Sequence, residues 1–205
     1  MSKIFRPILP AKDGCVEREL DGIHYMHPLD EKTDSYKKLY EEGCIPKEVY
    51  RKLIDISGLK ELSISELSDM CQKTIFLGQD IELSDGTTER FEFKDQDQSN
   101  IKQLWDAIKD GATAYPYQSD NGACKVYSAI DIAKIYVTMS TTITSNLTYY
   151  HQLKDYVNSL ETADEVEAVT WGQELTGEYL EHYNTMMSEA TSQTQAIIQK
   201  FGGTQ

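Results

Sequence analysis

The chain has 205 residues, enough for one domain of ordinary size or for a small domain attached to a larger one. A hydrophobic content of 40% supports a packed core, and 34 acidic against 20 basic residues give a net charge of −14. Because an acidic surface repels phosphate backbones and anionic membranes, neither nucleic acid nor a membrane is an expected partner.

The cysteines are four and widely spaced, and no C-x-x-C pair occurs, so neither a zinc ribbon nor a thioredoxin-type site is indicated. Scattered single thiols suit synthesis in a reducing compartment. The opening MSKIFRPILP is too short and too rich in proline for the apolar core of a signal peptide. We therefore expect the chain to be made in the cytoplasm.

The first third of the chain predicts short elements. Residues 1–30 mix apolar pieces with Pro and Gly, which indicates an irregular arm with one or two short strands. The segment DSYKKLYEEGCIPKEVYRKLIDISG predicts two short helices, the first ending at Gly43 and the second at Gly58. SISELSDMCQK predicts a third, with Ser63 as its N-cap.

The periodicity changes at about residues 74–94. Here Ile81 and Leu83 alternate with acidic residues, and the dipeptide Asp85-Gly86 lies between this run and a second alternating run, ERFEF. Gly at the second turn position tolerates the positive φ that a tight hairpin turn needs. The segment predicts one β-hairpin.

A helix and a tight bend follow. DQDQSNIKQLWDAIKDG predicts a helix that stops at Gly111, with one apolar face made by Ile101, Leu104, Trp105 and Ile108. We expect Trp105 to be buried and its indole to pack near Tyr115 or Tyr117 of the AYPY segment. A small hairpin is predicted across Asp120–Gly122.

The remainder predicts helices. A long helix is expected over about 128–160, with apolar residues recurring at threes and fours. A short helix capped by a Thr162–Glu165 box and stopped at Gly172 follows, and a last helix starts near Thr176. The fold class is thus α+β and mainly α-helical, with a division into 1–72, an arm with short helices for attachment, and 73–205, the hairpin and helical domain.

The long helix lacks charge in its middle. Between Lys134 and Lys154 no Asp, Glu, Lys or Arg occurs, whereas a solvated helix face normally carries charge. Two readings stay open: the domain's own helices cover one face and a partner chain the other, or the helix is central to a single domain. The candidate interface residues are Tyr115, Tyr117, Thr141, Thr144, Ser145 and Thr148.

No motif for chemistry is present in the sequence. His24 and His27 are three residues apart without a helix to fix their spacing, which is a weak metal pattern. Acidic pairs such as Asp95 and Asp97 lie at helix starts, where the helix dipole favours them. No phosphate loop, nucleophile elbow or zinc-helix motif occurs. We expect no catalytic residue, no cofactor and no metal, and therefore a protein that is not an enzyme.

A joint pattern of segments carries a family resemblance. The DG hairpin, DQSNI, YPYQSDNGACKVYSAIDI, TYYHQLKDYVNSL and WGQEL together cover about half of the chain, residues 80–183. They resemble a domain of unknown function found in tail proteins of phages and prophages of Gram-positive gut bacteria. DSYKKLYEEGCIPKEVYRKLI, near residues 35–54, looks more faintly like the short XkdX-type phage tail proteins.

The resemblance implies a structural component of a phage tail or tail-like particle, at the baseplate or the base of a tail fibre. It implies other tail or baseplate proteins and the fibre as partners, a homo-oligomer within a symmetric assembly, and the virion as the location. The alternative is a tail-fibre assembly chaperone that leaves before the particle is complete. An enzyme acting on the host wall is the third hypothesis, and no residues for it can be assembled.

Overall fold

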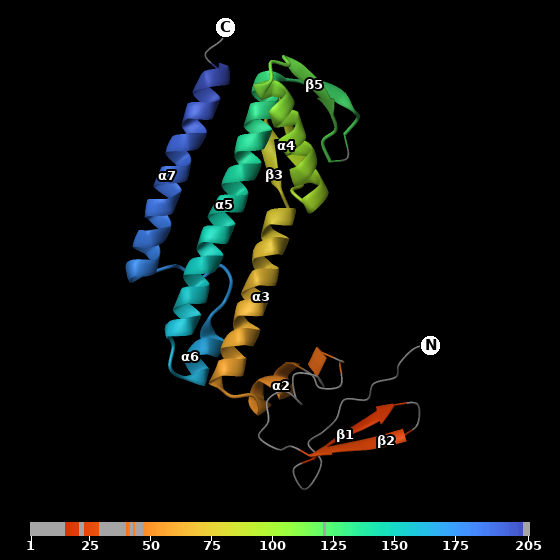
Figure 1. Cartoon of the computed structure of the whole chain (residues 1–205), viewed down its shortest axis with the longest axis vertical. Coiled ribbons are helices and arrows are strands. Elements are labelled where there is room, and N and C mark those ends of the chain that lie inside the picture. Colours follow the sequence, from red (N-terminus) through yellow and green to blue (C-terminus); the bar gives the residue numbers. More distant parts are fainter. Residues whose placement is uncertain are drawn as a thin grey trace. The chain divides into compact units, whose positions relative to one another are not determined.

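The computed structural model (Figure 1) describes residues 15–20, 23–28, 40–41, 43, 47–120 and 122–202. The chain divides into two compact units. The first comprises the residues up to Ser63 together with Leu160–Ala168, and the second comprises Ile64–Ser159 and the residues from Val169 onward.

The fold class predicted from the sequence is confirmed: the described chain is mainly α-helical, with small antiparallel hairpins. Among the described residues the strands form three two-stranded sheets, pairing β1 with β2, β3 with β4 and β5 with β6. No helix in this part of the chain combines the length and the apolar character needed to cross a membrane.

The first unit contains the predicted N-terminal strands. β1 (Cys15–Leu20) and β2 (Ile23–Pro28) are antiparallel. α2 (Lys47–Leu53) is the second of the predicted short helices, and most of the first lies outside the described residues. α6 (Ala163–Ala168) begins with the predicted box, in which the Thr162 hydroxyl donates to Glu165 Oε2 at 2.7 Å.

α3 (Ile56–Phe76) corrects two predictions. Gly58 does not end a helix and Ser63 does not cap one, because both lie inside this single 21-residue helix. The cap is Asp55, whose Oδ1 accepts a hydrogen bond from the Gly58 N–H at 2.9 Å. The predicted domain boundary near residue 72 falls within α3, and the division at that residue stays a prediction.

The predicted central hairpin is confirmed. It consists of β3 (Gln79–Glu82) and β4 (Thr88–Phe91), with Ile81 opposite Glu89. The Leu83 N–H donates to the Thr87 carbonyl at 2.8 Å, and Gly86 has the positive φ that the turn needs, 82°.

The next helix and hairpin are also confirmed. α4 (Asp95–Lys109) buries the predicted residues Ile101, Leu104, Trp105 and Ile108. β5 (Ala114–Tyr117) pairs with β6 (Lys125–Ser128). The Trp105 indole stacks on Tyr136 of the long helix with centroids 4.9 Å apart, and its expected packing near Tyr115 or Tyr117 stays a prediction.

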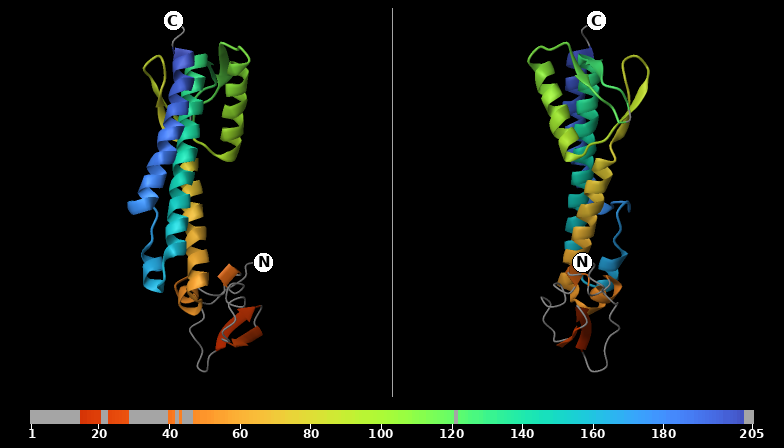
Figure 2. Two further views of the ribbon diagram at one scale, coloured as in Figure 1. Left: turned by 60° about the vertical axis from the view of Figure 1, so that its left-hand side comes forward. Right: turned by 90° about the vertical axis from the view of Figure 1, so that its right-hand side faces the viewer.

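The long helix α5 (Ala129–Ser159) has the predicted extent. Ser128 caps it, its Oγ accepting from the Asp131 N–H at 3.3 Å. α7 (Gly177–Gly202) packs along α5, as Figure 2 shows. Gly172 does not stop α6, which ends at Ala168; instead, with a φ of 92°, it lies in the connection to α7.

The main core lies between α4, α5 and the two hairpins of the second unit (Figure 2). The most enclosed members come from different parts of the chain: Phe91 of β4, Phe93 just after it, Ile101 of α4, and Ile132 and Ile135 of α5. The first half of α5 is therefore wrapped by residues distant from it in sequence.

Replacing Trp105 by alanine tests this core. The side chain is 6% exposed and stacks on Tyr136, so Trp105→Ala should lower the free energy of unfolding by about 3–5 kcal/mol. Urea denaturation followed by far-UV circular dichroism measures the loss. Tyr115→Ala is the control, since Tyr115 is 42% exposed and its loss should cost less than about 1 kcal/mol. Equal losses for the two variants would contradict the assignment.

Gly78 gives a second prediction. It has a φ of +67°, and a Cβ there would lie 1.8 Å from the Phe91 carbonyl oxygen. Gly78→Ala must move the strand backbone and should cost more than about 2 kcal/mol. Gly86→Ala is the matched control, with a φ of +82° but nothing within 4 Å of the added Cβ, so only the strain of about 1 kcal/mol applies. Thermal unfolding of both variants decides; a milder effect at Gly78 than at Gly86 would disprove the close approach.

Candidate interaction surface

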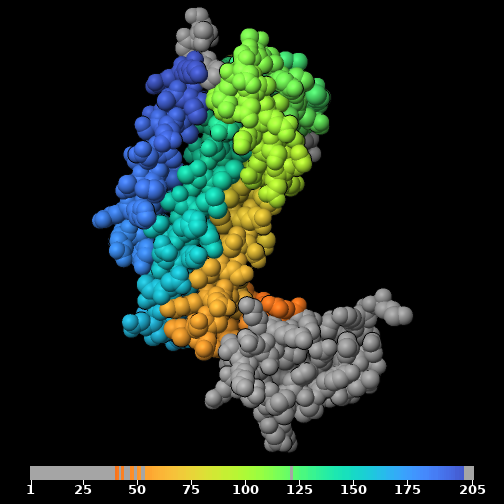
Figure 3. Space-filling view, in the orientation of Figure 1, coloured from red at the N-terminus to blue at the C-terminus, as the bar shows by residue number. Residues whose placement is uncertain are grey.

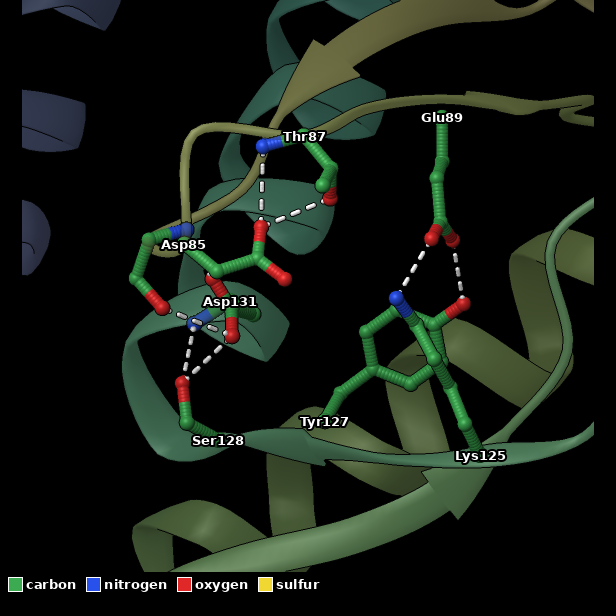
Figure 4. A network of polar contacts seen from close by, with 8 residues as sticks. Asp85, Thr87, Glu89, Lys125, Tyr127, Ser128 and Asp131 are labelled. Atoms are coloured by element: carbon green, nitrogen blue, oxygen red, sulfur yellow. Dashed lines mark hydrogen bonds and ion pairs between the residues drawn. The ribbon is translucent and has the colours of Figure 1, made fainter.

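The carboxylate of Asp131 joins the central hairpin to the start of α5 (Figure 4). Its Oδ1 accepts from the Ser84 N–H at 2.7 Å, and its Oδ2 accepts from the hydroxyls of Ser84 at 3.0 Å and Ser128 at 2.6 Å. Burial alone would raise the pKa of Asp131, but the hydrogen bonds from Ser128 and Ser84 outweigh it and lower this pKa. The charged form is therefore the one that holds the two elements together.

A second carboxylate, Glu89, joins β4 to β6 (Figure 4). The Tyr127 hydroxyl donates to Glu89 Oε2 at 2.6 Å, and Lys125 forms an ion pair with Oε1. Burial opposes ionisation of Glu89, yet the hydrogen bonds from Lys125 and Tyr127 lower its pKa. In return, burial and the bond to Glu89 raise the pKa of Tyr127. The two hairpins of the second unit are thus tied to each other.

Aromatic rings fill the space behind these polar contacts. Phe91 lies parallel to Tyr117 at 6.3 Å between centroids and meets Tyr127 edge-on at 5.9 Å. Burial, reinforced by the nearby negative charges of Asp97 and Asp120, raises the pKa of Tyr117 to about 12. These ring contacts pack the two hairpins against each other.

A groove of about 530 Å³ runs between α4 and α5. Its walls are uncharged apart from one acidic and one basic side chain of α4. The lining residues are Asp95, Gln98, Ser99 and Lys102 of α4 and Tyr136, Met139, Ser140, Ile143 and Thr144 of α5.

Of the predicted interface residues, Tyr115 and Tyr117 come together at a smaller hollow of about 240 Å³ beside α4. Tyr115 is 42% exposed, whereas Tyr117 is half-buried in the aromatic cluster. Tyr115 is therefore available for contact, and much of Tyr117 is committed to the core.

The four predicted hydroxyl residues of α5, Thr141, Thr144, Ser145 and Thr148, are all half-buried. Thr144 lines the groove beside α4. The Ser145 Oγ donates to the Thr142 carbonyl at 3.1 Å, so this hydroxyl is used within the helix. The structure does not bring the four into one contact with the tyrosine pair, and their interface role stays a prediction.

The ionisable groups suited to chemistry are dispersed in the described part of the chain. There, no group of three or more His, Cys, Asp and Glu side chains is placed to hold a metal ion. His151 and His182 are exposed on α5 and α7. Cys124 is exposed, and Cys71 is buried, which raises the pKa of its thiol. His24 and His27 lie in β2, and their side chains are outside the described residues.

Sequence reasoning missed both carboxylate contacts. Ser128 and Asp131 have the spacing of a helix cap and form one, but Asp131 also accepts hydrogen bonds from Ser84, 47 residues away. Nothing in local spacing signals such a contact. Glu89 lies two residues before Phe91 and therefore on the same face of the strand, and nothing in the ERFEF pattern indicates its polar partners.

Comparison with known proteins adds no relative: no family model, curated protein or solved structure matches this chain.

Removing the Asp131 charge should separate α5 from the hairpin. Asp131→Asn puts an amide N–H toward donors at a buried site, 7% exposed, and should cost about 1–3 kcal/mol at pH 7. Because the folded pKa is lowered, the stabilisation is present above the unfolded value of about 3.9 and is lost as the pH falls through the folded value. The variant should therefore lose less stability than wild type on acidification below about pH 4.

Urea denaturation at a series of pH values measures this effect. Asp85→Asn is the control, because Asp85 lies in the exposed turn and is hydrogen-bonded by the nearby Thr87; its replacement should cost under about 1 kcal/mol at pH 7. If Asp131→Asn were no more harmful than Asp85→Asn, the buried carboxylate would not hold the elements together.

Proposed function

We propose that this chain is a structural component of a phage tail or tail-like particle, located at the baseplate or the base of a tail fibre, where it attaches or organises fibres. The proposal draws on the resemblance over residues 80–183. The observation that carries it is the second unit itself, in which Asp131 and Glu89 tie both hairpins to each other and to α5.

A fixed shape is what such a role requires. The contacts of Asp131 and Glu89 join β4, β6 and the start of α5, and the rings of Phe91, Tyr117 and Tyr127 pack behind them. Beside this rigid part the groove between α4 and α5 stays open. A rigid body with an open, weakly charged groove can present a constant surface to neighbouring subunits.

The proposed partners are other tail or baseplate proteins and the fibre, within a symmetric assembly that contains several copies of this chain. The net charge of −14 fits protein partners better than nucleic acid.

Mass spectrometry of purified particles tests the proposal. Particles banded on a density gradient should contain this chain in a fixed molar ratio to the other tail subunits, and the ratio should survive a high-salt wash that removes loosely bound protein. A chain found in the lysate but absent from washed particles would refute a structural role.

One observation favours the alternative, a tail-fibre assembly chaperone. From Gly177 to Lys200 none of the described α7 side chains is fully buried, although the helix runs along α5. A helix held by half-buried contacts is easier to displace by a client than a core helix. Under this alternative, deletion of the gene leaves misfolded fibres, and the chain is absent from particles of the wild type.

A further inference from the structure

The connection between β5 and β6 folds back onto β4. We call its described residues, 118–120 and 122, the docked loop. The Asp120 N–H donates to the Arg90 carbonyl of β4 at 2.9 Å. Within the loop, the Gly122 N–H donates to the carbonyl of the buried Ser119 at 3.1 Å. Figure 3 shows this hairpin and α4 side by side at the surface.

The side chain of Asp120 has one oxygen that its surroundings leave without a hydrogen bond. Asp120 is half-buried, its Oδ2 is enclosed by the protein, and within the described chain no donor lies at hydrogen-bonding distance of this atom. A carboxylate oxygen removed from water without a donor is costly while it is charged, because nothing replaces its hydration. Asp131 is the opposite case, because Ser84 and Ser128 donate to its two oxygens. The site of Asp120 therefore disfavours the charged form that the site of Asp131 favours.

Negative charges near Asp120 act in the same direction as burial. Burial is the main cause that raises the pKa of Asp120, and the charges of Glu92, just after β4, and Asp97 of α4 raise it further. A backbone hydrogen bond from Glu92 and the positive charge of Lys94 offset these effects only in part, and Lys94 is itself paired with Glu92. Tyr117 of β5, whose pKa burial raises to about 12, stays uncharged.

Two other charged groups of β4 are engaged elsewhere. The Arg90 guanidinium forms an ion pair with Asp80 of β3 at 3.2 Å. Glu89 accepts hydrogen bonds from Lys125 and Tyr127 of β6. These contacts direct both charges away from the unsatisfied oxygen.

We propose that the docked loop is a pH-sensitive contact, which holds the β5–β6 hairpin on β4 more tightly when Asp120 is protonated than when it is charged. Protonation removes the unsolvated charge and its repulsion from Glu92 and Asp97. The folded chain binds this proton more tightly than the unfolded chain, in which the pKa of Asp is about 3.9. The contact therefore strengthens as the pH falls through the raised folded pKa, and the gain is complete below the unfolded value. The inference goes beyond the proposed tail role and does not depend on it.

Hydrogen exchange of single backbone amides in the full chain, followed by NMR, tests this contact. Protection factors are corrected for the pH dependence of chemical exchange, so they report the opening of the loop. In wild type, the protection of the Asp120 and Gly122 amides should rise at least about threefold between about pH 7 and about pH 4. Asp120→Asn is uncharged at every pH. Its protection should exceed that of wild type at pH 7 and should stay constant on acidification.

The matched control is Asp110→Asn. It makes the same chemical change at an exposed residue that follows α4, so the loop amides should keep the wild-type pH dependence. Glu92→Gln tests the repulsion itself. It removes a neighbouring negative charge and releases Lys94, and both changes favour the charged form of Asp120. The rise in protection should therefore be smaller and should occur at lower pH.

Several results would overturn the inference. They are a wild-type protection that stays flat or falls on acidification, an Asp120→Asn variant that keeps the wild-type rise, and an Asp110→Asn variant that loses it. If Asp120→Asn does not fold, the wild-type profile and Glu92→Gln still decide, because an unchanged rise in a folded Glu92→Gln would show that charge repulsion at Asp120 does not control the loop.

Discussion

The second unit depends on the buried negative charge of Asp131. A carboxylate removed from water is tolerated only when hydrogen bonds replace its hydration, and here Ser84 and Ser128 supply them from two elements. Satisfying this one side chain requires the turn of the central hairpin to sit at the first turn of α5. These hydrogen bonds therefore help to fix the position of the hairpin turn on the helix.

The apolar core packs the same elements against one another. Phe91 of β4, Phe93 just after it, Ile101 of α4 and Ile132 of α5 belong to one apolar cluster, and all four are almost completely enclosed. Glu89 likewise joins the second hairpin to the first, because its partners Lys125 and Tyr127 belong to β6. The polar contacts define the arrangement, and hydrophobic burial supplies most of the stability.

Local pattern predicted the elements well and their contacts poorly. The alternation around Ile81 and the Asp85-Gly86 turn predicted the hairpin. Apolar residues three and four positions apart predicted the buried face of α4. Both signals lie within a few residues of the chain. The prediction that Gly58 ends a helix was wrong. Glycine often ends helices, but here Asp55 caps the start of α3, and Gly58 lies in the first turn of that helix. Trp105 was predicted to be buried, yet its stacking on Tyr136 depends on how two helices pack, which a single sequence does not encode locally.

The half-buried packing of α7 has a consequence for the order in which this unit opens. A helix whose described side chains from Gly177 to Lys200 are nowhere fully enclosed gains little from each contact, while Ile132 and Ile135 of α5 are entirely enclosed. Its amide protons should exchange with solvent through local opening that leaves α4, α5 and the hairpins intact. The unit would thus behave as two cooperative layers, a slow-exchanging centre and a fast-exchanging outer helix.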